Sequence, residues 1–204
     1  ANRLKFSSPT AKELLLLLEN FKELNEIKKR NKDRFSSFEK IEIKNLSFKY
    51  EDRKEKIISD LNLIIPKNTF IGVRGESGAG KSTFTDLVLG LVKPDSGSIT
   101  VDGQYINDFM YKWQNSIGYV SQNIYLTPET IKKNIAFGFE DSEINDELLN
   151  QAINKSALRD FIENLPEKEN TIIGEMGSLI SGGQKQRIGI ARALYNKPSL
   201  LIFD

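Results

Sequence analysis

The fold is decided by the stretch Gly75-Glu76-Ser77-Gly78-Ala79-Gly80-Lys81-Ser82, which satisfies the phosphate-loop pattern of a glycine, four residues and Gly-Lys-Ser. The apolar run Phe70–Val73 precedes this stretch, and residues 82–91 follow it with apolar side chains on one helical face. Strand, loop and helix therefore come in the order of a phosphate-binding unit. The pattern predicts an α/β protein that binds the phosphates of a nucleotide.

The residue types of this loop suit phosphate chemistry. Glycines let successive backbone N–H groups approach phosphate oxygens, and a helix that begins at Lys81 adds the positive end of its dipole. The Lys81 ammonium can reach the β- and γ-phosphates, and the Ser82 hydroxyl can bind Mg²⁺. The alternative is a glycine-rich turn with a solvated lysine. The candidate nucleotide contacts are Gly75, Glu76, Ser77, Gly78, Ala79, Gly80, Lys81, Ser82 and Thr83.

The composition excludes several other chemistries. The 204-residue chain contains no Cys and no His, so a thiolate nucleophile, an imidazole base, a disulfide and a zinc site of the usual ligands are all absent. Its 29 Lys and Arg residues nearly balance 28 Asp and Glu residues, and the net charge of +1 argues against a general nucleic-acid binder. No apolar run approaches the roughly 20 residues of a membrane-spanning helix.

The first 40 residues form a segment of different character, in which cationic side chains outnumber anionic ones. Thr10 and Glu13 form a capping box after Pro9, and apolar residues recur at helical spacing as far as Ile27. The pattern predicts an N-terminal helix whose apolar stripe packs in a bundle or coiled coil, or against another part of a larger protein. Its basic end is either solvated or close to anionic lipid headgroups. We place a boundary near residue 38.

Further apolar runs follow that boundary. Ile41–Phe48 and Ile57–Ile65 have the composition of strands, and Ile117–Val120 resembles them. Near the end of the chain, the run Leu200–Phe203 suits a parallel strand buried on both faces, and it is followed by Asp204. A carboxylate at the carboxyl end of such a strand lies where open α/β sheets bind ligands, as in a Walker B motif. An ordinary core strand with a terminal acid is the alternative.

A second glycine-containing motif, Ile180-Ser181-Gly182-Gly183-Gln184, begins 20 residues before Leu200. Ser181 supplies a hydroxyl, and the two glycines permit close approach of another molecule to the backbone at the start of a helix. On its own, the motif is also explained as a simple helix-starting turn.

Together these motifs resemble the nucleotide-binding domain of ATP-binding-cassette (ABC) transporters over residues 39–204. Residues 180–184 are similar to the family's Leu-Ser-Gly-Gly-Gln signature, with Ile180 in place of leucine. The resemblance implies a P-loop NTPase core with an antiparallel β subdomain and an α-helical signature subdomain at about residues 123–190, preceded by the N-terminal helix. Residues 95–103 would form an antiparallel hairpin. Further matches are Gln186, Arg187, Ala191 and Arg192.

The resemblance also implies ATP and Mg²⁺ as cofactors and gives roles to two isolated residues. Tyr50 would stack on adenine, although packing in a core would equally explain a strand aromatic. Gln122 would be the Q-loop glutamine, which reaches Mg²⁺ and the attacking water, although surface polarity alone would explain it.

Three groups of site residues follow from the resemblance. The candidate catalytic residues are Lys81, Gln122 and Ser181. The candidate Mg²⁺ ligands are Ser82, Gln122 and Asp204, the last acting through water. In the family the signature contacts the γ-phosphate of ATP held by the opposite domain of a head-to-tail dimer, and the corresponding residues are Ser181, Gly182, Gly183 and Gln184.

Two segments resemble features of the exporter subclass. Residues 171–177 are similar to its Thr-x-x-Gly-Glu-x-Gly loop, and residues 130–135 are similar to its Thr-Ile-x-x-Asn-Ile run. Residues 1–38 would then be the end of a membrane domain and a connector helix. This implies an ATPase on the cytoplasmic face of the cell membrane, joined to a transmembrane domain and paired with a second copy.

The sequence therefore predicts the ATP-hydrolysing domain of an exporter that moves or flips a substrate across a membrane. The alternatives are a soluble ABC ATPase of DNA repair or translation, and a nucleotide-sensing module without hydrolysis. The family places a glutamate base directly after the Walker B aspartate and a switch histidine further on, and the sequence ends at Asp204. We expect this chain alone to hydrolyse ATP negligibly, and nothing in it specifies the transported substrate.

Overall fold

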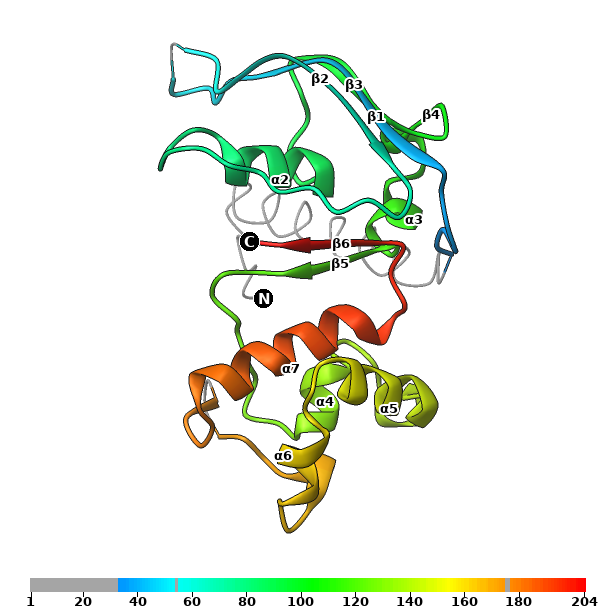
Figure 1. Cartoon of the computed structure of the whole chain (residues 1–204), viewed down its shortest axis with the longest axis vertical. Coiled ribbons are helices and arrows are strands. Elements are labelled where there is room, and N and C mark those ends of the chain that lie inside the picture. Colours follow the sequence, from blue (N-terminus) through cyan, green and yellow to red (C-terminus); the bar gives the residue numbers. More distant parts are fainter. Residues whose placement is uncertain (1–32, 54, 175–176) are drawn as a thin grey trace, which may run out of the picture. The chain divides into compact units, whose positions relative to one another are not determined.

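The computed structural model describes residues 33–53, 55–174 and 177–204 (Figure 1). The chain divides into two units, residues 1–33 and 34–204. The helix expected within the first unit lies outside the described residues. The second unit includes Phe35, which packs edge-on against Phe109 with 5.1 Å between ring centroids, and Phe38, which packs against Trp113 at 6.3 Å. Phe35 and Phe38 therefore contribute to the core of the second unit.

A four-stranded antiparallel sheet in the order β2-β1-β3-β4 forms the first half of this unit. Its strands are β1 (Lys40–Phe48), β2 (Ile58–Pro66), β3 (Ser96–Val101) and β4 (Gln104–Tyr105). Asp102 and Gly103, both with positive φ, form the turn between β3 and β4, so the predicted hairpin is confirmed.

Helix α2 (Lys81–Leu89) packs against this sheet. Its Leu87 and Val88 are buried in one apolar cluster with Ile41 of β1, Ile99 of β3 and Trp113. The Trp113 indole donates a hydrogen bond of 2.7 Å to the Val88 carbonyl, so the largest side chain of this core also leaves no unsatisfied donor. A 3₁₀ turn, η1 (Ile106–Phe109), and α3 (Met110–Gln114) carry Trp113 into place.

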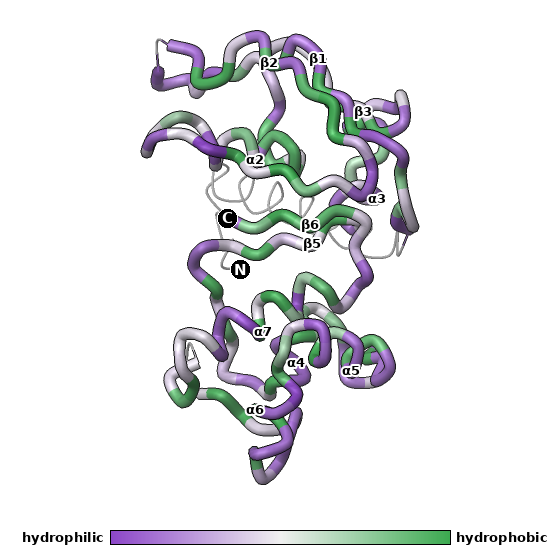
Figure 2. Tube along the Cα trace, viewed as in Figure 1, coloured by the Kyte–Doolittle hydropathy of each residue, from purple (hydrophilic) through white to green (hydrophobic). Residues whose placement is uncertain are grey.

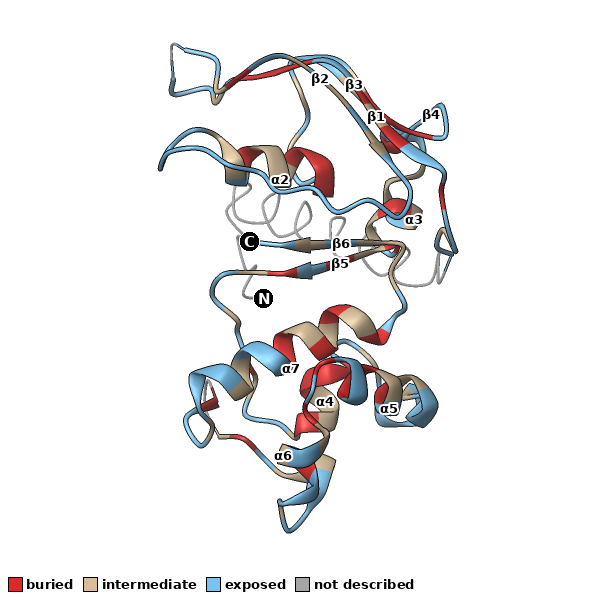
Figure 3. Ribbon diagram, viewed as in Figure 1, coloured by how far each residue is buried: buried red, intermediate tan, exposed pale blue. Residues whose placement is uncertain are grey.

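A second, two-stranded sheet consists of β5 (Ile117–Val120) and β6 (Leu200–Phe203), which pair in parallel; the sequence predicts a parallel strand at residues 200–203, but not its partner. The expectation that β6 is buried on both faces is wrong. Leu200 and Ile202 pack on the cluster around Trp113, whereas Leu201 is 39% and Phe203 57% exposed (Figure 3). The face that carries Leu201 and Phe203 is therefore only partly covered, because helix α7 (Gly182–Tyr195) contacts β5, where Val120 is 5% exposed, and leaves these two side chains accessible.

The strand expected at Phe70–Val73 is also not observed. Residues 69–76 have no regular structure, and the Phe70 side chain is 96% exposed. A strand needs a partner for its backbone groups. Among the described strands, β2 pairs only with β1 and β6 pairs only with β5, so no described strand supplies that partner.

The remaining residues form a helical region with its own core. The helices are α4 (Ile131–Ile135), α5 (Asp146–Lys155), α6 (Arg159–Glu163) and α7 (Gly182–Tyr195), with 3₁₀ turns η2 (Asp141–Glu143) and η3 (Lys168–Asn170). Leu126, Ile153 and Ile188 are fully buried in this core, and α7 contacts α4, α5 and β5. Hydrophilic and hydrophobic residues alternate along these helices (Figure 2). Within the part of the chain that the structure describes, no helix is long and apolar enough to span a bilayer.

Candidate functional site

The phosphate loop joins the irregular segment after β2 to the start of α2. Residues 75–79 are exposed, and Gly80, with φ of 87°, is the residue that precedes the helix. No side chain caps this helix start, so its first N–H groups remain available to a ligand. The Lys81 ammonium donates to the Gly75 carbonyl at 2.9 Å and to the Glu76 carbonyl at 2.8 Å. The Lys81 side chain therefore folds back over the phosphate loop, where we expect it to bind phosphate oxygens.

Gly80 is required for steric as well as backbone reasons. A Cβ atom at this position would lie 2.7 Å from Cγ2 of Ile57 and 3.3 Å from its carbonyl oxygen. Positive φ also disfavours any residue with a side chain there. The loop is thus held closely against the residue that precedes β2.

Tyr50 lies beside the start of α2. Its ring packs edge-on against Phe48 at 4.9 Å, and its hydroxyl lies 3.5 Å from Oγ1 of Thr83, one turn into the helix. The ring is partly buried on the Trp113 cluster. The structure thus brings Tyr50 to the phosphate-loop helix while leaving part of the ring accessible.

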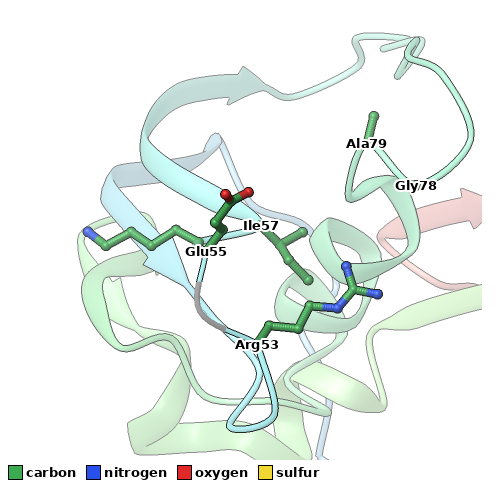
Figure 4. Close-up of a pocket in the computed structure, with 6 residues that line it drawn as sticks. Arg53, Glu55, Ile57, Gly78 and Ala79 are labelled. Atoms are coloured by element: carbon green, nitrogen blue, oxygen red, sulfur yellow. The ribbon is translucent and has the colours of Figure 1, made fainter.

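A cavity of about 440 Å³ lies between the phosphate loop and the connection from β1 to β2. Arg53, Glu55, Lys56 and Ile57 line it on one side, and Gly78 and Ala79 line it on the other (Figure 4). The sequence analysis did not identify Arg53 as a site residue. The signal that points to it is its position three residues after Tyr50, in a run of charged residues.

The carboxyl ends of β5 and β6 carry the other candidate ligands. Asp204 follows β6 and accepts a hydrogen bond of 3.2 Å from the Tyr119 hydroxyl, and Gln122 is exposed just after β5. Burial raises the pKa of Tyr119 above its ordinary value, and the nearby carboxylates of Asp204 and Asp86 add to the effect. Because parallel strands end at the same edge, Asp204 and Gln122 share one edge of the sheet.

Mg²⁺ prefers oxygen ligands, and the hydroxyl of Ser82, the amide oxygen of Gln122 and the carboxylate of Asp204 are of that kind. Ser82 is exposed on the first turn of α2, so its hydroxyl is accessible to a ligand held in the loop. The donor set therefore fits the metal chemically.

The signature residues begin α7 with a capping box. The Ser181 hydroxyl accepts a hydrogen bond from the Gln184 N–H at 3.3 Å, and the Gln184 side-chain oxygen accepts one from the Ser181 N–H at 2.7 Å. Ser181, Gly182 and Gly183 are exposed. A Cβ on either glycine would meet no atom within 4 Å beyond its neighbours and its own helix. The packing of the described chain thus does not require these two glycines.

The two exporter-like segments lie together. Thr130 and Ile172 form an antiparallel bridge, the Ile131 N–H donates to the Thr171 carbonyl at 3.1 Å, and the Ile173 N–H donates to the Glu129 carbonyl at 3.3 Å. Nothing in the sequence spacing alone showed that segments 40 residues apart would pair.

Arg192 connects these elements to α7. Its guanidinium donates to the Tyr125 carbonyl at 2.8 Å and to the Asn134 carbonyl at 2.7 Å, and it lies over the ring of Phe137. Burial lowers the pKa of Arg192 below its ordinary value. The hydrogen bonds of Arg192 therefore connect the segment that follows Gln122 to α7, the helix that begins with the signature.

Comparison with known proteins identifies the class. Residues 58–204 match the sequence pattern of the ABC transporter family, so the chain belongs to that family. The P-loop NTPase fold with its antiparallel β and helical subdomains, predicted from the motifs, is thereby confirmed.

Particular relatives refine this assignment. The chain is 39% identical, over 162 residues, to a multidrug resistance ABC transporter ATP-binding and permease protein of Lactococcus lactis, and 38% identical, over 174 residues, to the sophorolipid transporter of Starmerella bombicola. These alignments cover 79% and 81% of the chain but only 27% and 13% of the relatives.

A solved structure supports the same subclass. A bacterial Atm1-family ABC exporter with ATP bound superposes with a TM-score of 0.75 and 33% identity over 86% of this chain and 30% of that one. The relatives and this structure confirm the predicted exporter subclass of nucleotide-binding domain. The chain thus spans less than a third of the length of each of these proteins.

Proposed function

We propose that this chain is the ATP-binding part of an exporter and that ATP hydrolysis there powers movement of a substrate across a membrane. The observation that carries the proposal is the phosphate loop, with an uncapped helix start and the Lys81 ammonium folded over it. A γ-phosphate in this loop would replace the two carbonyl acceptors of Lys81 with oxygens that carry negative charge, which strengthens each hydrogen bond.

The other residues take complementary roles in this proposal. Tyr50 stacks on the adenine, and Ser82, Gln122 and Asp204 hold Mg²⁺. When bound, the metal neutralises charge on the β- and γ-phosphates. Gln122 also orients the water that attacks the γ-phosphate, while Lys81 stabilises the charge that grows on the transferred group.

The signature acts on a second copy of the chain. Ser181, Gly182, Gly183 and Gln184 are exposed or only partly buried, and the absence of packing around the two glycines leaves room for a phosphate to approach the backbone. In a head-to-tail dimer each signature would close on the ATP of the other copy, and closure would drive the membrane part. We place the chain on the cytoplasmic face of the membrane, since ATP is available there.

The exporter assignment is favoured over a soluble ABC ATPase by two observations. Segments 129–131 and 171–173 pair so that Ile172 and Glu129 are exposed beside the buried core, and the named relatives include an ATP-binding and permease protein. We infer that this paired feature docks on a transmembrane domain of the same protein.

The test is Lys81→Ala in this chain. Loss of a partly desolvated ammonium should weaken ATP binding by about 2 kcal/mol, roughly thirtyfold. Isothermal titration with ATP measures it, and Lys185→Ala, on α7, is the matched control. Equal ATP affinity for Lys81→Ala and the parent protein would reject the nucleotide assignment.

A further inference from the structure

The connection between β1 and β2 carries a cation that has no partner in the described chain. The Arg53 guanidinium makes no hydrogen bond or ion pair with any described residue, and its side chain is exposed. It nevertheless lines the 440 Å³ cavity opposite Gly78 and Ala79. In Figure 4 the Arg53 side chain extends from its loop toward the ribbon that carries Gly78, whereas the Glu55 carboxylate lies closer to Ile57.

Both ends of this connection are fixed. The Arg53 N–H donates to the Tyr50 carbonyl at 3.0 Å, which closes a turn, and the Ile57 N–H donates to the Phe48 carbonyl at 2.9 Å. Ile57 in turn contacts Gly80, as the 2.7 Å approach to a Cβ at that position shows. Arg53 is therefore held next to the phosphate loop by backbone bonds and packing at both ends of a short segment.

Its place along the site identifies the ligand atoms that it can reach. Tyr50 lies at the base end of the proposed nucleotide, and Lys81 lies at the end that holds the β- and γ-phosphates. Arg53 follows Tyr50 by three residues and shares its cavity with Gly78 and Ala79 of the phosphate loop. The group between the base and the β-phosphate of a nucleotide is the ribose with its α-phosphate.

We propose that Arg53 is a specificity-determining residue that binds the α-phosphate of the nucleotide. The proposal rests on the proposed ATP site. A guanidinium presents a rigid fork of N–H donors that matches two phosphate oxygens. Lys56 adds a second positive charge to the same wall, and Glu55 is the only carboxylate among the residues that line this cavity. Arg53 thus favours nucleotides with a phosphorylated 5′ position over nucleosides.

The experiment compares Arg53→Ala, Arg53→Lys and the matched control Lys155→Ala, an exposed cation at the end of α5 outside this cavity, for binding of ATP, ADP and adenosine by calorimetric titration or competition. Arg53→Ala should weaken ATP and ADP by the same factor, about fivefold, because the α-phosphate is common to both and exposed ion pairs contribute modestly. Adenosine affinity should not change. Arg53→Lys should recover part of the loss, and Lys155→Ala should change ATP affinity less than twofold.

Three results would overturn the proposal. The first is unchanged ATP affinity in Arg53→Ala, the second is an equal loss for adenosine, and the third is a loss for ATP clearly larger than that for ADP, which would place the guanidinium at the γ-phosphate. Lys81→Ala distinguishes a wrong role for Arg53 from a wrong assignment of the ATP site. If Lys81→Ala weakens ATP while Arg53→Ala does not, only the role of Arg53 is wrong.

Discussion

Two helix starts in this protein are preceded by glycine or serine motifs, and they are built in opposite ways. At α2, Gly80 precedes the helix and no side chain caps it. At α7, Ser181 and Gln184 form a complete capping box. The first N–H groups of α2 therefore remain open for an anion, whereas one of those of α7 already bonds to the chain itself.

The glycines of the two motifs also differ in whether the packing of their own chain requires them. Gly80 is confined by Ile57 and by its positive φ, so the fold of the chain itself demands a glycine. Gly182 and Gly183 meet nothing, so nothing within the described chain demands them. The chain's own packing therefore explains the glycine of the phosphate loop but not those of the signature, which is what we expect if the signature completes the proposed site on a second copy.

The largest expected effect is at the phosphate loop. Gly80→Ala should lower the free energy of unfolding by about 3 kcal/mol, because it adds left-handed backbone strain and a collision with Ile57. Gly103→Ala is the matched control, since its φ of 83° is similar and a Cβ there meets no atom within 4 Å. It should cost only the strain, about 1 kcal/mol.

Urea denaturation of the two variants measures this difference. Equal losses of unfolding free energy for Gly80→Ala and Gly103→Ala would mean that the Ile57 side chain moves aside to accommodate the new methyl group. Close packing around the glycine would then no longer distinguish the phosphate loop from the signature.

A smaller effect is expected at the α7 cap. Ser181→Ala should lower the free energy of unfolding by about 1 kcal/mol, because the N–H of Gln184 loses its acceptor. Ser181→Asn, which keeps a cap acceptor, should restore most of this loss. ATP affinity of the chain should stay the same in both variants. A drop in ATP affinity comparable to that of Lys81→Ala would mean that the signature and the loop serve the same nucleotide.

The contrast between the two helix starts also shows how much of the site the sequence predicts. The loop-and-helix unit at Gly80 and Lys81 was predictable, because local residue types determine it. The start of α7 at Ser181 was predictable for the same reason. In both places a few adjacent residues suffice to set the backbone.

Features that depend on distant partners were less predictable. Phe70–Val73 has the composition of a strand, but no described strand pairs with it. Burial of Phe203 was overestimated because an apolar run indicates a strand without showing what covers it. The position of Arg53 beside Gly78 depends on how the β1–β2 connection folds over the loop, and no local pattern encodes that.

The smallest expected effect within one chain is at Gly183. Gly183→Ala should change the free energy of unfolding by about 0.5 kcal/mol or less, in the stabilising direction, because alanine favours helices and meets no neighbour there. Gly189→Ala, in the same helix, is the matched control and should destabilise by about 1 to 2 kcal/mol, since its Cβ would lie 2.4 Å from Cδ1 of Ile124.

Gly183→Ala should have its main effect on the association of two copies of the protein. The added methyl group occupies the surface that we propose to meet the γ-phosphate of a second copy, so ATP-dependent association of the longer protein, followed by sedimentation, should be lost while ATP binding to each copy persists. Gly183→Ala that destabilises the chain by more than 1 kcal/mol would show that this glycine serves its own fold. Normal association with normal stability would show that the signature surface does not touch the partner's nucleotide. Either result would remove the distinction between a site complete within one chain and a site completed by two.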